Sequence, residues 1–174
     1  MNKSAVFKIE LSYIKNSRIK ESGETLINLL PDYFFLVPAS SGGKYHPSFA
    51  AGDGGLVRHT KAAVRIAHEL LENHSVNNYS DDEKDLIILS LLLHDGIKCG
   101  NPKEKYTRVD HPLLASRFVK DNKNKTKLTD DEVKYICESI ESHMGEWNKD
   151  YEGNEVLPIP KSKNSRFVHM CDFL

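Results

Sequence analysis

Histidines and aspartates recur at expected helix ends and turns, and they are the residues of this chain best suited to metal chemistry. They are His59, the adjacent pair His94-Asp95, His111, His143 and Asp172. Imidazole and carboxylate groups suit divalent transition metals such as Mn, Fe, Ni, Co and Zn. An aspartate between histidines can bridge two ions with its two oxygens. Because six protein ligands exceed the four of a closed zinc site, the set predicts two metal ions with room for water.

Each of these residues also has an ordinary structural explanation when it is considered alone. His59 could be a half-buried residue of an amphipathic helix, and Asp172 could be a solvated acid near the end of the last helix. The His94-Asp95 pair could cap a helix C-terminus, where a cationic histidine is favoured, and His143 could cap its own helix. His111 beside Asp110 could be a local hydrogen-bonded cap. The metal prediction therefore depends on whether the fold brings all of them together.

Helical periodicity and capping residues predict the elements that carry the donors. Apolar residues at helical spacing predict a helix over residues 56–72. Ser80 and Thr129 each precede a Glu by three residues, which is a capping box, and the helices they begin are expected to end at about His94 and His143. The first of these two helices is apolar nearly all round, so it is expected at the centre of a bundle.

Single capping residues predict the remaining helix boundaries. Asp110 as an N-cap and Pro112 in the first turn predict a helix through Lys120. Gly96 follows the central helix as a C-cap glycine would, and a last helix is expected from about Ser162. The pattern indicates an all-α fold, a compact bundle of about six helices whose ends can gather the donors.

The chain is expected to form one domain over residues 1–174, with residues 1–43 as an N-terminal extension packed on it. A chain of 174 residues suits a single domain, and no repeat or linker divides it. Residues 26–30 suggest a short helix that Pro31 stops. Residues 33–37 could form a short strand or a buried apolar segment, because periodicity does not distinguish the two.

Composition and charge argue against several function classes. The 24 Lys and Arg residues nearly balance the 25 Asp and Glu residues, which argues against a general binder of nucleic acid or anionic membrane. No apolar run approaches the roughly 18 residues of a membrane span, and the N-terminus lacks the apolar stretch of a secretory signal. The three cysteines form no paired framework, so a cytoplasmic protein with reduced thiols is expected.

The joint pattern resembles the HD-domain superfamily of metal-dependent phosphohydrolases. The donors follow the order His, His-Asp, His, His, Asp, and their flanking residues match over about residues 44–174. The segments that carry the resemblance are 54–60 (GGLVRHT), 91–98 (LLLHDGIK), 110–114 (DHPLL), 141–145 (ESHMG) and 167–172 (FVHMCD). The first segment most resembles a subgroup that includes 3′-to-5′ exoribonucleases.

The resemblance implies a ligand set. One metal would be held by His59, His94, Asp95 and Asp172. Asp95 would bridge to a second metal, completed by His111 and His143. Superfamily members that lack the two middle histidines usually hold one metal, so their presence here favours two.

The resemblance also implies a reaction. Where the superfamily commonly has His-Asp-Ile-Gly-Lys, this chain exchanges Gly96 and Ile97, but Lys98 keeps its offset and can reach a phosphate. A hydroxide that bridges the two metals would attack phosphorus, while Lys98 and the metals offset charge on the phosphate oxygens. Asp95 would act chiefly as a ligand and could orient the nucleophile.

Four further residues are candidates for substrate binding, each with a structural alternative. Lys44 and His46 could contact a phosphate or belong to an ordinary polar loop. Trp147 could stack on a base or serve as a core or lid residue. His169 could contact substrate or support the metal centre, or be a packed histidine. The expected substrate is a small phosphorylated molecule such as a nucleotide, with short single-stranded nucleic acid as an alternative.

Three functions remain open from the sequence. The leading one is hydrolysis of a phosphoester in a nucleotide or short oligonucleotide. Some relatives use the same ligand order to hold two irons and oxidise a small alcohol, and Lys98 favours phosphate over this alternative. A non-catalytic binding module that keeps metal for stability is the third, and the complete ligand set argues against it.

Overall fold

The computed structural model describes residues 2–40, 46–76 and 78–174, and over these residues it is helical without a β-strand. Its α-helices are α1 (Lys8–Ser12), α2 (Ser17–Leu29), α3 (Gly55–Leu71), α4 (Asp81–Leu93), α5 (His111–Asp121), α6 (Asp130–Glu141) and α7 (Lys163–Phe173). Four short 3-10 helices join them, η1 (Lys3–Phe7), η2 (Asp32–Phe35), η3 (Ser48–Ala50) and η4 (Lys123–Lys125). The predicted all-α class is confirmed, and the five-residue α1 is the helix that periodicity did not reveal. Within the described ranges, no helix has the length and apolar content that a membrane crossing requires.

Helix α4 is the central element of the bundle. Both predicted capping boxes are present, since Ser80 and Glu83 cap α4 reciprocally, as Thr129 and Glu132 cap α6. Every residue from Leu86 to Leu93 is buried, because α3, α6, α2 and α7 all pack against α4. Helices buried on all sides are apolar all round, which is the pattern that the sequence shows here.

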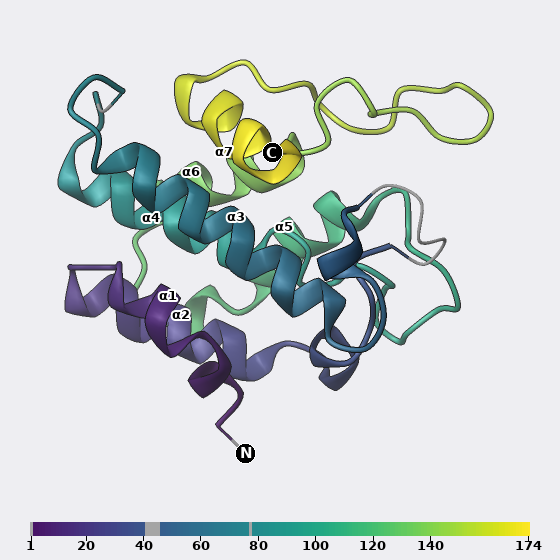
Figure 1. Cartoon of the computed structure of the whole chain (residues 1–174), viewed down its shortest axis with the longest axis horizontal. Coiled ribbons are helices and arrows are strands. Elements are labelled where there is room, and N and C mark those ends of the chain that lie inside the picture. The colour runs from purple at the N-terminus through teal and green to yellow at the C-terminus, as the bar shows by residue number, and fades with distance from the viewer. Residues whose placement is uncertain (1, 41–45, 77) are drawn as a thin grey trace.

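The N-terminal segment packs against the face of α3 and α4 that lies away from α7. In Figure 1, α1 and α2 lie on one side of the α3–α4 pair and α7 lies on the other. Phe7 and Phe34 are fully buried in the common core. The buried Asp85 of α4 accepts hydrogen bonds from the backbone N–H groups of Lys15 (3.0 Å) and Asn16 (2.9 Å), which fixes the turn between α1 and α2.

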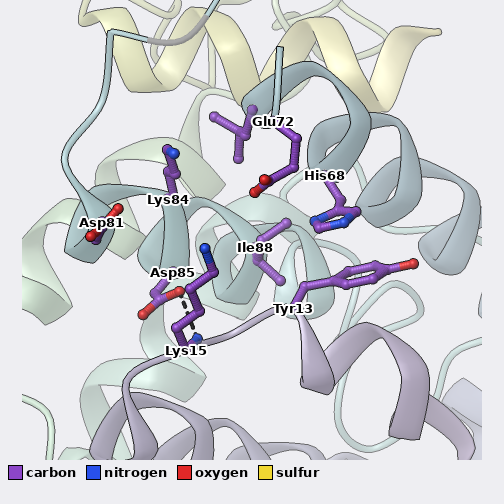
Figure 2. A pocket seen from close by; sticks show the side chains of 9 residues that line it. Tyr13, Lys15, His68, Glu72, Asp81, Lys84, Asp85 and Ile88 are labelled. Carbon is purple, nitrogen blue, oxygen red and sulfur yellow. Dashed lines mark hydrogen bonds between the residues drawn. The ribbon is translucent and has the colours of Figure 1, made fainter. Parts of the chain in front are cut away.

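A small cavity lies beside this turn and carries no site. Figure 2 shows Tyr13, His68 and Asp85 around it, with the bond from Lys15 to Asp85 dashed. The Tyr13 and His68 rings stack at 3.8 Å between centroids, and the remaining volume is about 10 Å³. That volume is no larger than one water molecule needs.

The structure decides one local alternative and corrects two local expectations. Residues 33–37 form no strand, and the buried alternative holds at Tyr33 and Phe34, which enter the core from the 3-10 helix η2. Gly96 is not a left-handed C-cap, and a Cβ there would lie 2.6 Å from Leu30 Cδ2, so the glycine is needed for close packing. Asp110 occupies the N-cap position of α5, but its carboxylate pairs with Arg108 instead of capping the helix.

Candidate metal centre

The predicted donors converge from five helices into one cluster. His59 lies in α3, His94 and Asp95 directly follow α4, His111 begins α5, His143 follows α6 by two residues, and Asp172 is in α7. Their ligand atoms form two groups whose members lie within 4.8 Å of one another, and Asp95 belongs to both. All are buried except Asp172, whose side chain is 16% exposed.

The first group surrounds one oxygen of each aspartate. The Nε2 atoms of His59 and His94 lie 2.8 Å and 3.0 Å from Asp172 Oδ1. The same two nitrogens lie 3.6 Å and 3.2 Å from Asp95 Oδ2. Two imidazoles and two carboxylates therefore point their donor atoms at one small volume.

The second group uses the other oxygen of Asp95. Oδ1 of Asp95 lies 3.1 Å from His111 Nε2 and 3.4 Å from His143 Nε2. The two Nε2 atoms are 3.3 Å apart. Asp95 thus directs one carboxylate oxygen to each group, which is the geometry that a bridging ligand requires.

Backbone carbonyls fix which nitrogen of three histidines faces the cluster. The Nδ1 atoms of His94, His111 and His143 lie 2.6–2.7 Å from the carbonyl oxygens three residues earlier. A carbonyl oxygen can only accept, so each Nδ1 must carry the proton and donate it. Each Nε2 is then directed at the cluster, and such carbonyl contacts are the usual way in which proteins orient histidine ligands.

The donor atoms of the cluster are satisfied better by a bound cation than by hydrogen bonds to one another. Asp95 Oδ1 is buried and, within the described part of the chain, has no hydrogen-bond donor despite its two histidine neighbours. Burial lowers the pKa of His111 to about 4, helped by Lys98, so its Nε2 holds a lone pair at neutral pH. A lone pair and a carboxylate oxygen that face each other without a proton are satisfied by a positive ion between them. The residues therefore fit divalent metal at both groups.

Both aspartates of the first group are ionised at neutral pH, as metal binding requires. Burial raises the pKa of both Asp95 and Asp172, but the charge of His94, together with that of Lys98 at Asp95, outweighs burial and holds both pKa values well below the usual range. Burial lowers the pKa of His94, but the two aspartates outweigh it and raise the value to about 10. A proton on His94 thus balances the carboxylates in the absence of a cation, and metal would displace it.

Comparison with known proteins agrees with this geometry. A family model described as the HD domain matches residues 56–173, which is more than half of the chain. The chain belongs to the HD-domain family. No match was found among curated proteins or among solved structures. HD domains are helical and largely metal-dependent hydrolases, and every donor described above lies within the matched region of this HD domain.

Lys98 lies in the cluster, as its spacing from Asp95 suggests. Its Nζ atom donates to Asp95 Oδ2 at 3.2 Å, and the residue is only 6% exposed. The exchanged Gly96-Ile97 order therefore leaves the lysine within reach of the centre of this HD domain.

The candidate substrate residues differ in how they lie relative to the cluster. His46 is half-buried at the edge of the cluster, with its ring edge-on to His59 at 4.5 Å, whereas Lys44 lies outside the described residues. Burial, with smaller contributions from His59 and Lys98, lowers the pKa of His46 to about 4, so its ring is neutral at pH 7. His169 is not a member of either donor group, and its Nδ1 donates to the backbone carbonyl of His143 at 2.7 Å.

Tyr33 is a residue at the site that sequence reasoning missed. Its buried hydroxyl accepts a hydrogen bond from the Cys99 N–H (3.0 Å) and donates one to the Gly100 carbonyl (2.8 Å). Burial raises the pKa of Tyr33 to about 12, so the hydroxyl keeps its proton at neutral pH. It ties η2 to the turn that follows Lys98. Because Tyr33 comes before the matched region, no motif could have pointed to it.

Proposed function

We propose that this HD domain hydrolyses a phosphoester, in a nucleotide or a short oligonucleotide, with two divalent transition-metal ions bound. The observation that carries the proposal is the division of Asp95 between two donor groups, with Lys98 at its Oδ2 atom. A two-ion centre next to a buried ammonium suits an oxygen-rich anion such as phosphate.

The chain's own residues would hold the ions and orient the substrate. In the proposal, the first ion is bound by His59, His94, Asp95 and Asp172. The second is bound by Asp95, His111 and His143. When bound, such a pair of cations supplies a hydroxide nucleophile near neutral pH and offsets phosphate charge. Asp95, held by both groups, would keep the two positions at a fixed separation.

Lys98 and His46 would act on the substrate itself. The ammonium of Lys98 would turn from Asp95 to a non-bridging phosphate oxygen and stabilise the charge that develops there in the transition state. The neutral His46 could contribute a hydrogen bond but not a charge at pH 7. Its place beside His59 supports a contact with substrate at the more open side of the cluster.

The test is an activity screen of protein whose metal content has been measured. Protein loaded with Mn, Fe, Ni, Co or Zn is assayed on nucleoside monophosphates, short oligonucleotides and a generic phosphodiester. We expect release of phosphate or of nucleoside monophosphate with at least one metal and none after chelation. Oxygen uptake with iron, and no phosphoester cleavage with any metal, would instead favour oxidation of an alcohol.

Tyr33 should act as a positioning residue for this reaction. We expect Tyr33→Phe to lower kcat about tenfold with little change in KM or in bound metal, because loss of the hydroxyl loosens the turn that carries Lys98. Steady-state kinetics and elemental analysis measure these quantities. The control is Tyr106→Phe, since Tyr106 is 61% exposed on the segment that follows this turn. An unchanged kcat, or loss of metal together with activity, would contradict the positioning role.

A further inference from the structure

Three aromatic rings form an exposed shelf beside the metal centre. The rings of Trp147 and Phe173 stack at 5.6 Å between centroids and 18° between planes. The His169 ring lies 6.5 Å from Trp147 and 6.2 Å from Phe173. Trp147 is 53% exposed and Phe173 is 65% exposed, so both keep ring surface open to solvent. We call these three residues the aromatic shelf.

The shelf continues directly from the proposed metal ligands. In α7, His169, Asp172 and Phe173 have the i, i+3, i+4 spacing that places residues on one helix face. The face that aims Asp172 into the first donor group therefore also carries two shelf rings. The opposite side of α7 is buried in the core through Phe167, Val168 and Cys171.

The other end of the shelf is anchored to the second donor group. Trp147 follows His143 by four residues, and His169 donates its Nδ1 proton to the His143 carbonyl. Gly145, between His143 and Trp147, has a φ of +62°, and a Cβ there would lie 2.3 Å from the His169 ring. Only glycine allows this turn to lie flat on the imidazole. The shelf is thus held in place by backbone contacts next to one ligand of each group.

The chemistry of the shelf suits a planar aromatic group. An aromatic ring exposed by half of its surface gains free energy when another ring stacks on it, and stacking accepts any nucleobase. His169 adds one directional group, because its Nδ1 donates to a carbonyl and its Nε2 has no partner among the residues that the structure describes. An exocyclic amino group or ring N–H of a base could donate to it.

We propose that the aromatic shelf binds the nucleobase of the substrate while the substrate's phosphate occupies the metal centre. The inference rests on the proposed function, which places the phosphate at the metal centre. It adds that the protein recognises the nucleoside part of the substrate as well as its phosphate. The substrate class is then a nucleotide, or the terminal nucleotide of a short strand. Sugar phosphates without a base fall outside it.

Trp147 is the only tryptophan of the chain, so its fluorescence reports on the shelf directly. Metal-loaded protein is mixed with adenosine monophosphate and separately with ribose 5-phosphate, and the emission is read by stopped flow before the substrate is turned over. We expect the nucleotide to quench the emission and the sugar phosphate to leave it unchanged. No change with the nucleotide, or equal quenching by both, overturns the proposal. A change in emission with protein concentration alone would also overturn it, because a second copy of the chain would then cover the shelf.

A matched pair of variants tests the same point through affinity. Phe173→Ala should raise the Kd of adenosine monophosphate about tenfold, since the base loses one of the aromatic side chains on which it stacks. Tyr151→Ala is the control, because Tyr151 is 94% exposed on the loop that also carries Trp147. Equal Kd values for the two variants overturn the proposal.

The outcomes separate the shelf from the reaction. In metal-loaded protein, Phe173→Ala should lower the ratio of kcat/KM for the nucleotide to that for ribose 5-phosphate about tenfold, and Tyr151→Ala should not. Cleavage of both substrates with an unchanged ratio in Phe173→Ala overturns the shelf and leaves the hydrolase standing. Quenching by the nucleotide without any phosphoester cleavage overturns the hydrolase and leaves the shelf as a nucleotide site.

Discussion

Replacing Asp95 by alanine is expected to empty both halves of the metal centre and to lower kcat/KM by at least about a thousandfold. The expectation follows from its two oxygens, which face separate donor groups, so that one substitution removes a ligand from each. Metal ions at such centres contribute several kcal/mol to the transition state, and each 1.36 kcal/mol is a factor of ten in rate. Elemental analysis and steady-state kinetics measure the two effects.

Two further variants keep this prediction falsifiable. Asp95 is buried and contacts both His94 and Lys98, so alanine is also expected to weaken the fold, because Lys98 loses its ion pair and His94 keeps only Asp172. Asp95→Asn keeps the volume, and we expect it to fold by circular dichroism and still lose activity. Asp121→Asn, at the exposed end of α5, should behave as the parent. An Asp95→Asn protein that binds two ions and keeps a tenth of the activity would refute the bridging role.

Metal removal is expected to lower the melting temperature by roughly 10 °C. A ligand present at a thousand times its Kd stabilises the folded state by about 4 kcal/mol, and for a chain of this size each kcal/mol moves Tm by about 2–4 °C. Thermal unfolding with saturating metal and with chelator measures the shift. The sign follows from linkage, because the folded chain gathers the donors that bind the ions and the unfolded chain disperses them.

Variants of one donor group sharpen the metal-removal experiment. We expect His143→Ala, which lacks a donor of the second group, to bind one ion in place of two and to keep part of the Tm shift. Asp95→Asn should show almost none. A Tm that is the same with and without metal, in protein that demonstrably binds it, would mean that the cluster is not the binding site.

The elements that position the cluster were predictable because their signals are local. Two capping boxes and an all-apolar stretch predicted α4 and α6 from sequence alone. The positions of the donors at helix ends predicted that they would gather at one site. The N-terminal elements were harder, because η2 and α1 are too short for periodicity to decide between structures. Gly96 shows the same limit. A glycine is needed there because Leu30, which is distant in sequence, packs against it, and no neighbouring residue indicates that contact.

The contribution of the N-terminal segment to the site could not be predicted for a related reason. Tyr33 holds the turn after Lys98 by two hydrogen bonds, across 66 and 67 residues of sequence. Leu30 packs over Gly96, two residues before Lys98. Both contacts depend on how η2 docks on the bundle, and the family match begins only at residue 56. The functional unit we propose is therefore larger than the matched region.

The contact between His59 and Asp172 joins positions that are 113 residues apart. An ion shared by these two side chains would act as a crosslink that closes a very long loop, much as a disulfide does, but one that a change in metal supply could open. The end of α7 would then be the part of the backbone whose amide hydrogens exchange with solvent most readily once the ion leaves. Metal availability could in this way govern how long the protein survives proteolysis as well as whether it is active.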